Sequence, residues 1–193
     1  MAVGGCLLVL VVGAICAAMW GIWRYNNLIS LRKQVANGWR QIDVQLKRRH
    51  DLIPNLVSAV RGEMQFEQDT LEKVIQARNS AVAARGVADA ADKEGALSQT
   101  LGRLFALAEN YPNLKANENV RSLMEELSST ENRIGFARQF YNDIATRFNT
   151  AQQVFPDSYI AQTFKFQPVE LFELKDETER AVPKVDLSLR PPQ

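Results

Sequence analysis

Histidine, cysteine and interior proline are scarce in this chain of 193 residues. The one histidine is His50, and the two cysteines, Cys6 and Cys16, both lie in an apolar N-terminal run. Metal sites built on histidine or cysteine ligands need more of these groups than the rest of the chain contains. The HExxH, CxxC, GxSxG and phosphate-loop patterns are absent from the sequence as well. We therefore expect no catalytic residue, no metal site and no cofactor.

A strong charge of one sign is also missing. The chain has 23 Lys and Arg against 22 Asp and Glu, so no global basic field predicts a nucleic-acid partner. Only three prolines precede the C-terminal segment (Pro54, Pro112 and Pro156), and β-branched residues form no alternating runs. Both features favour helices over a sheet. The length fits one all-α domain and a membrane anchor.

Residues 3–23 contain no charged side chain. As a helix this run would be about 31 Å long, close to the thickness of the hydrocarbon layer of a bilayer. A cleaved signal peptide would have a charged start and a small-residue cleavage site, whereas here helical patterning continues directly from the run. We assign residues 1–24 to an uncleaved transmembrane signal anchor.

The charges around the anchor predict its orientation. Lys and Arg follow the run from Arg24 onward and none precedes it, which predicts an N-terminus outside the cell and a cytoplasmic body. Trp20, Trp23 and Tyr25 would then form an aromatic belt at the membrane interface, with Arg24 contacting headgroups.

Small residues recur every four positions in the anchor, at Gly13, Ala17 and Gly21. Such a face lets two membrane helices approach closely, so it is a candidate surface for self-association. The alternative is the ordinary small-residue content of any membrane helix.

Apolar residues then follow steps of three and four, which predicts a helix that continues the anchor: Leu28, Leu31, Val35, Trp39, Ile42 and Leu46. We interpret Lys47–Asp51 as a corner, with Asp51 as the N-cap of a second helix, Pro54 in its first turn and His50 exposed. The alternative is an uninterrupted helix kinked at Pro54.

Three further helices are expected. The second ends near Val82, and the Ala- and Gly-rich residues 83–95 predict a loop. The third runs from about Ala96 to a stop at residues 110–113. The fourth, from Val120 to Phe148, keeps a 3.5-residue period typical of a supercoiled seam, with one polar position at Thr130 that is a candidate for setting register.

Pro156 ends the fourth helix, and an aromatic segment follows with Tyr159, Phe164, Phe166 and Phe172. We expect this segment to pack as a strap on the bundle, because loose aromatic side chains in water are costly. The predicted fold is thus an antiparallel four-helix bundle over residues 25–174 with an aromatic C-terminal strap. Residues 175–193 are charged and rich in proline, which predicts a disordered tail.

Several long motifs resemble the LemA family of bacterial membrane proteins: YNNLISLRKQV, IDVQLKRRHDLIPNLV, LGRLFALAENYPNLKAN, STENRI, ARQFYND and FPDSYIAQTFKF. They occur in this order, and the resemblance runs from about Tyr25 to Phe172. The resemblance implies a bacterial inner-membrane protein with an N-terminal membrane helix and a helical bundle. It also implies homology to a magnetosome-associated member of the family, which suggests membrane organisation. It supplies no catalytic residues.

The polar motif positions are expected to form contacts inside the bundle or at an interface: Asp43, Arg48, Arg49, Asp51, Asn55, Arg103, Glu131, Asn132, Arg133 and Tyr141. The leading hypothesis is a non-enzymatic membrane scaffold that contacts lipid and forms a homo-oligomer or recruits a membrane protein. The alternative is an accessory subunit of another membrane machine, such as a protease or stress-response complex. A ligand-binding or enzymatic bundle, with a polar cavity around Asp43, Glu131, Asn132 and Arg133, is a remote third option.

Overall fold

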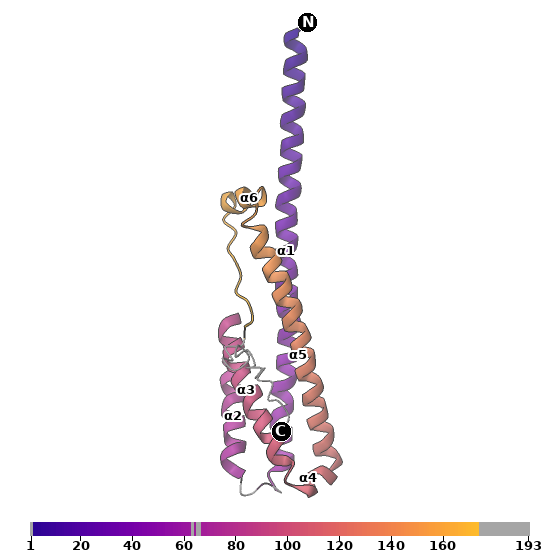
Figure 1. The fold of residues 1–193 in the computed structure, drawn as a ribbon, viewed down its shortest axis with the longest axis vertical. Helices are drawn as coiled ribbons and strands as arrows, with labels where there is room; N and C mark the ends of the chain where they lie inside the picture. Colours follow the sequence, from indigo (N-terminus) through magenta and orange to yellow (C-terminus); the bar gives the residue numbers. More distant parts are fainter. Residues whose placement is uncertain (1, 63, 65–66, 174–193) are drawn as a thin grey trace, which may run out of the picture.

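The computed structural model describes residues 2–62, 64 and 67–173, and this part of the chain is all-α with no strand. The six helices are α1 (Ala2–Val60), α2 (Gln68–Val82), α3 (Val87–Ala108), α4 (Pro112–Ala116), α5 (Glu118–Ala151) and α6 (Asp157–Thr163). Figure 1 shows one long N-terminal helix whose lower part joins a bundle of antiparallel helices. The predicted fold class is confirmed. The expected tail, residues 175–193, lies outside the described residues.

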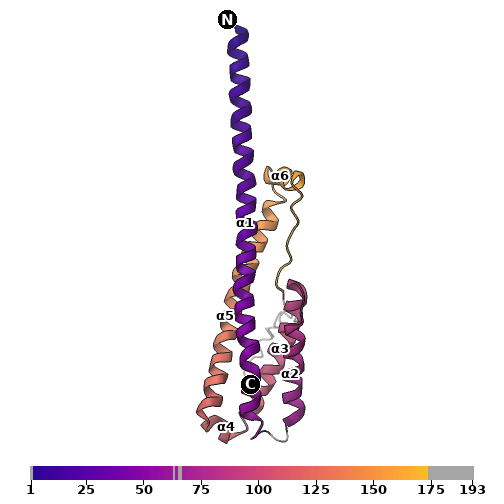
Figure 2. The ribbon, with the colours of Figure 1, turned by 180° about the vertical axis from the view of Figure 1, so that it is seen from behind.

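Helix α1 is continuous from the apolar run into the bundle, over 59 residues. At 1.5 Å per residue it is about 88 Å long, and its N-terminal part extends beyond the other helices (Figures 1 and 2). The predicted corner at Lys47–Asp51 is wrong, because the chain reverses only after Val60 and Asp51 is an exposed residue inside the helix.

The helix continues past Pro54 for a physical reason. A proline inside a helix has no N–H to bond the carbonyl four residues earlier, which here is that of His50. The side chain of Arg78, from α2, donates its Nε–H to this carbonyl at 3.1 Å. A tertiary contact thus replaces the missing helical bond, and no sequence pattern within α1 could have shown it.

Helices α1 and α5 form an antiparallel pair that runs the length of the bundle (Figure 1). Its seam buries the apolar residues that the periodicity predicts, among them Leu28, Val35 and Ile42 of α1 and Ile134 and Phe148 of α5. Gly38 is buried where α5 comes close: a Cβ there would lie 3.5 Å from the Cα of Tyr141. The hydroxyl of Thr130 bonds the Glu126 carbonyl of its own helix at 2.8 Å, so it needs no partner across the seam.

Helices α2 and α3 form a hairpin that covers one side of the α1–α5 pair at the end far from the N-terminus (Figure 2). Helix α3 begins at Val87 and not near Ala96, so most of the predicted loop is helical. The prediction failed because Ala90 and Ala91 looked like a weak pattern, whereas alanine is the best helix former and its small side chain is buried against α1 and α5.

An extended segment, residues 166–172, leaves α6 and runs back along α5 to the hairpin (Figure 1). Phe172 is buried in the core, and Phe166 packs against its edge. These two residues form the expected aromatic strap. Tyr159, in α6, does not pack as predicted and is largely exposed, whereas Phe164 is largely exposed but contacts the ring of Tyr25.

Candidate functional site

A buried arginine network links three helices of the bundle. The guanidinium of Arg49 (α1), which is 1% exposed, forms ion pairs with Glu94 of α3 and with Glu131 of α5. Its Nη1 also donates to the hydroxyl of Ser98 at 2.9 Å, and that hydroxyl donates to Glu131 at 3.0 Å. His50 Nε2 lies 2.7 Å from the second oxygen of Glu94.

The surroundings of Glu94 determine its charge. Burial alone would raise the pKa of this carboxyl, but the hydrogen bond from His50 and the charges of Arg49 and His50 outweigh it, so the pKa lies below its ordinary value of 4.5. Glu94 is therefore a carboxylate at neutral pH. Since a carboxylate only accepts hydrogen bonds, His50 Nε2 must carry the shared hydrogen.

This network corrects the interpretation of His50 as an exposed corner residue. Its side chain is 12% exposed and faces α3, because α1 continues through this position instead of turning. Of the basic residues around it, Arg48 pairs on the surface with Glu126 of α5 at 2.6 Å, and Lys47 is exposed. The arrangement ties α1 to both α3 and α5.

A second feature is an open groove of about 590 Å³ between α1 and α5. Its apolar residues are Val44 from α1 and Phe136, Ala137 and Phe140 from α5, and its polar ones are Arg40, Gln41, Gln45 and Arg133. Phe136 is 73% exposed, and Val44 and Phe140 are exposed as well. Within the described part of the chain, the Gln45 Oε1 atom is buried without a hydrogen-bond partner. The groove thus offers an exposed apolar surface flanked by polar side chains.

The anchor stands apart from the bundle. Among the described residues, α1 is the one helix long and apolar enough to cross a membrane. Gly13 and Ala17 are exposed and Gly21 is partly so, and a Cβ at either glycine would meet no atom within 4 Å. The predicted small-residue face is therefore uncovered in a single copy of the chain.

The predicted interface residues lie where α1 meets α6. Trp20 and Trp23 are exposed, and the guanidinium of Arg24 lies over both rings, 5.7 and 5.2 Å from their centroids. Arg24 also pairs with Asp157 of α6 at 3.5 Å. Tyr25 is only partly exposed, because its ring packs against those of Phe164 and Phe166.

The other predicted polar positions are not brought together. Asp43, Asp51, Asn55, Arg103, Asn132 and Arg133 are exposed at different places on the bundle. Asp43 lines a groove with His50 and Arg78, whereas Arg133 lines the groove with Phe136, so the two do not share the polar cavity of the remote third option. The described residues include no group of three His, Cys, Asp or Glu side chains placed to hold a metal.

Two asparagines hold the strap, and of the two only Asn142 lies in a family motif, ARQFYND. Asn149 exchanges two hydrogen bonds with the backbone of Val169, at 2.8 and 2.9 Å, and Asn142 does the same with Phe172, at 3.1 and 2.8 Å. Tyr141, one of the predicted contact residues, donates its hydroxyl to the Glu170 carbonyl at 2.7 Å. The seven-residue spacing of the two asparagines was a usable signal.

Comparison with known proteins agrees with these features. The sequence pattern of the LemA family matches residues 38–187, which is most of the chain. Protein LemA of Metamycoplasma hominis is 27% identical over 157 residues, covering 80% of this chain and 71% of that protein. The chain therefore belongs to the LemA family.

Magnetosome proteins are also similar to this chain. MamQ of Magnetospirillum gryphiswaldense and MamQ 2 of Paramagnetospirillum magneticum are each 24% identical over 180 residues. The alignments cover 80% of this chain but 66% of each MamQ protein, slightly less than two thirds. Together with the apolar N-terminal helix, the relatives indicate a membrane-associated helical protein.

Proposed function

We propose that this LemA-family protein is a non-enzymatic, single-pass scaffold in the bacterial inner membrane, which binds further copies of itself through the groove between α1 and α5. The proposal is carried by the exposure of Val44, Phe136 and Phe140 in the middle of a well-packed bundle. A contiguous apolar surface at such a place is typical of a protein–protein contact.

Two more features support assembly. Helix α1 joins the anchor to the bundle without a break, so contacts made by the bundle and by the small-residue face of the anchor act on the same rigid element. The face around Gly13, Ala17 and Gly21 would let two anchors pack closely. Two weak contacts on one rod strengthen each other, because the second forms at a high effective concentration once the first exists.

The lysines and arginines that follow the anchor favour a cytoplasmic bundle with the N-terminus outside. In this orientation the groove faces the cytoplasm, about 26 to 33 Å beyond Trp23 along α1. Its occupants would be other bundles at the same height above the membrane.

The mass of the full-length protein in lipid nanodiscs or detergent tests the proposal. We expect the wild type to form oligomers and Phe136→Glu to shift them toward monomers, since a charge in the groove opposes apolar contact. Val82→Glu is the matched control, because Val82 is an exposed apolar residue on α2, outside the groove. Strictly monomeric wild type at every concentration, or equal masses for wild type and Phe136→Glu, would overturn self-assembly through the groove.

A second candidate function is that of an accessory subunit of another membrane machine. The groove favours it in one respect: Arg40 and Arg133 both line it, so an acidic amphipathic helix would meet complementary charge. A photocrosslinking residue in place of Phe136, activated in cells, separates the two candidates. Crosslinks to the same chain support the scaffold, and crosslinks only to a different protein support the accessory subunit.

A further inference from the structure

The exposed large apolar side chains of the described bundle fall into two groups, with Val82 standing alone. The first group is the groove. The second is at the corner between α5 and α6, where Phe155 is 83% and Tyr159 is 73% exposed, with Val154 and Phe164 exposed beside them. We define residues 154–164 as the α5–α6 corner. Four exposed apolar side chains within eleven residues are costly in water, so the corner needs an occupant.

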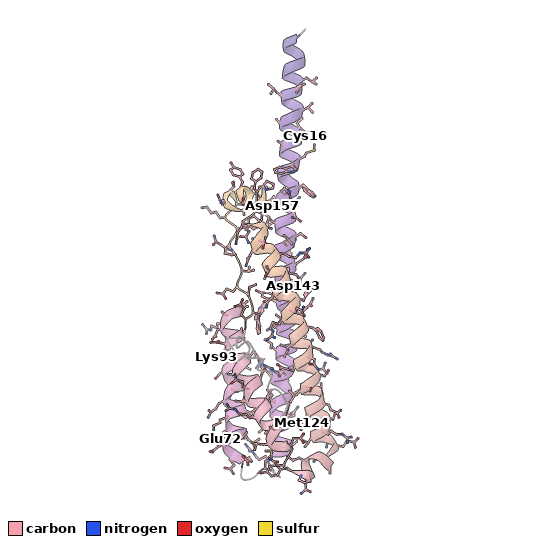
Figure 3. All side chains as sticks on the ribbon, in the orientation of Figure 1. Cys16, Glu72, Lys93, Met124, Asp143 and Asp157 are labelled. Carbon is pink, nitrogen blue, oxygen red and sulfur yellow. The ribbon has the colours of Figure 1, made fainter. Side chains whose placement is uncertain are left out.

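The place of the corner in the fold indicates that occupant. Asp157 in the corner pairs with Arg24, the first charged residue after the apolar run. The ring of Phe164 lies tilted against that of Tyr25, with 4.7 Å between their centroids, and Ile160 is buried with Leu28. The corner is thus fixed at the level where α1 leaves the apolar run. Figure 3 labels Asp157 at that end of the bundle, on the same side as Cys16 of the anchor and far from Met124.

The chemistry of the corner suits a membrane interface better than a water-exposed surface. Between Thr150 and Phe164 the one charged side chain is Asp157, and Arg24 partly neutralises it. The other polar residues there are uncharged. Aromatic side chains at headgroup depth bury their rings and, for tyrosine, keep the hydroxyl in water. Trp20 and Trp23 lie at the same end of the bundle, on α1.

We propose that the α5–α6 corner inserts Phe155 and Tyr159 into the headgroup region of the bilayer that α1 crosses. The chain then contacts the membrane at two points, separated by more than a hundred residues in sequence. A single helix can tilt and rotate in a bilayer, but a second contact beside it limits both motions. The bundle would be held upright, with the groove at a fixed height. The inference rests on the membrane attachment in the proposed function and does not require self-assembly.

Spin labels on single cysteines test the proposal in full-length protein reconstituted in nanodiscs of phosphatidylcholine and phosphatidylglycerol. In the reference variant, Cys6→Ala leaves Cys16 as the single cysteine, inside the anchor. In the other variants both native cysteines are replaced by alanine, and one new cysteine is introduced by Phe155→Cys, Tyr159→Cys or Val82→Cys. Collisions with oxygen, which partitions into lipid, and with a water-soluble nickel chelate give the depth of each label. All the substituted side chains of the bundle are exposed, so the fold should tolerate these changes.

We expect labels at 155 and 159 to collide several-fold less with the nickel chelate than the label at 82, and to remain accessible to oxygen. Nickel accessibility equal to that at 82 would overturn the inference. Protection from both reagents would also overturn it, because it means that protein and not lipid covers the corner. If the label at Cys16 itself lies in water, membrane attachment fails; if Cys16 lies in lipid and 155 and 159 do not, only the further inference fails.

A second variant tests whether the aromatic rings drive insertion. With the label at Val154, Phe155→Ser/Tyr159→Ser should raise nickel accessibility toward the value at position 82. An unchanged depth of this label after both rings are removed would contradict insertion by Phe155 and Tyr159.

Discussion

The α1–α5 pair is covered in two different ways along its length. Toward the end of the bundle that is far from the anchor, two helices cover it, and the charges of Arg49, Glu94 and Glu131 are held in the contact. Toward the anchor, an extended strap of seven residues covers the pair, and the uncharged amide side chains of Asn142 and Asn149 hold this strap in place. We refer to these as the hairpin half and the strap half.

The difference follows from what each cover can do with its own backbone. Helices bond most of their own N–H and C=O groups, so the hairpin meets the pair mainly through side chains, including charged ones. An extended segment beside a helix has no neighbouring strand to pair with, so its polar backbone groups need other partners. Asn142 and Asn149 supply them: seven residues of helix rise about 10.5 Å, and three residues of extended chain, from Val169 to Phe172, advance about 10 Å. The two spacings match.

The largest loss in the free energy of unfolding is expected in the hairpin half, for Arg49→Ala. This change leaves the carboxylate of Glu94 buried with His50 as its remaining partner, and removing one member of a buried ion pair costs about 3–5 kcal/mol. Chemical denaturation of the full-length protein in detergent, monitored by circular dichroism, measures this loss of unfolding free energy. Arg48→Ala is the matched control, because the Arg48–Glu126 pair is exposed and such pairs contribute about 1 kcal/mol or less. Similar losses for the two variants would mean that burial of Arg49 does not matter.

In the strap half, Asn142→Ala/Asn149→Ala should release the strap without unfolding the helices. Each asparagine makes two bonds to the strap backbone, and a hydrogen bond contributes about 1 kcal/mol net. Hydrogen exchange at the amides of Val169 and Phe172 measures the release, since both donate to the asparagines in the wild type. Gln152→Ala is the control, because Gln152 bonds a carbonyl of its own helix. Unchanged protection of both amides in the double variant would show that aromatic packing alone holds the strap.

The same contrast shows what the sequence could and could not predict. Apolar periodicity identified the buried face of α1 and α5, because a seam between two long helices imposes a regular repeat. It failed where a tertiary contact overrides a local rule. Pro54 is a strong breaker in isolation, but Arg78 satisfies the carbonyl that it leaves free. At Ala90 and Ala91, burial depends on how closely the helices approach, which apolar spacing does not encode.

The site residues divide in the same way. Arg49, Glu131 and Tyr141 were selected by their motifs and do make contacts, and Arg49 and Glu131 pair with each other. The further partners, Glu94 of Arg49 and Glu170 of Tyr141, come from segments that carry no such signal. The groove was not predicted, because an exposed Phe136 looks in sequence like any other apolar residue near the seam. Only the arrangement of the helices shows which side of α5 remains uncovered.

Acid should weaken the hairpin half selectively. The pKa of Glu94 is lowered in the folded protein, so its contribution to stability is fully present above pH 4.5 and is lost as the pH falls through the folded pKa. The groups that face it are Arg49 and His50. The pH dependence of the free energy of unfolding, compared between wild type and Glu94→Gln, separates the contribution of Glu94 from that of the other carboxylates. The difference in unfolding free energy between wild type and variant should shrink as the pH falls below 4.5. A difference that stays constant would contradict a stabilising role of the Glu94 carboxylate.

The smallest change in the free energy of unfolding is expected at the start of the strap, where Lys165 has a φ of 55°. The N–H of Phe166 bonds the Ala161 carbonyl at 2.9 Å and that of Lys165 bonds Gln162 at 3.2 Å, the pattern of a helix end that usually carries glycine. A left-handed conformation costs a residue with a Cβ about 1–2 kcal/mol. Part of the gain from glycine is offset by its freer unfolded state, so Lys165→Gly should stabilise the protein by about 1 kcal/mol or less. Lys165→Ala, which removes the charge and keeps the Cβ, should give no such gain. Equal unfolding free energies for the two variants would show that the turn is unstrained, and the strap half would then depend on its asparagines and aromatic residues alone.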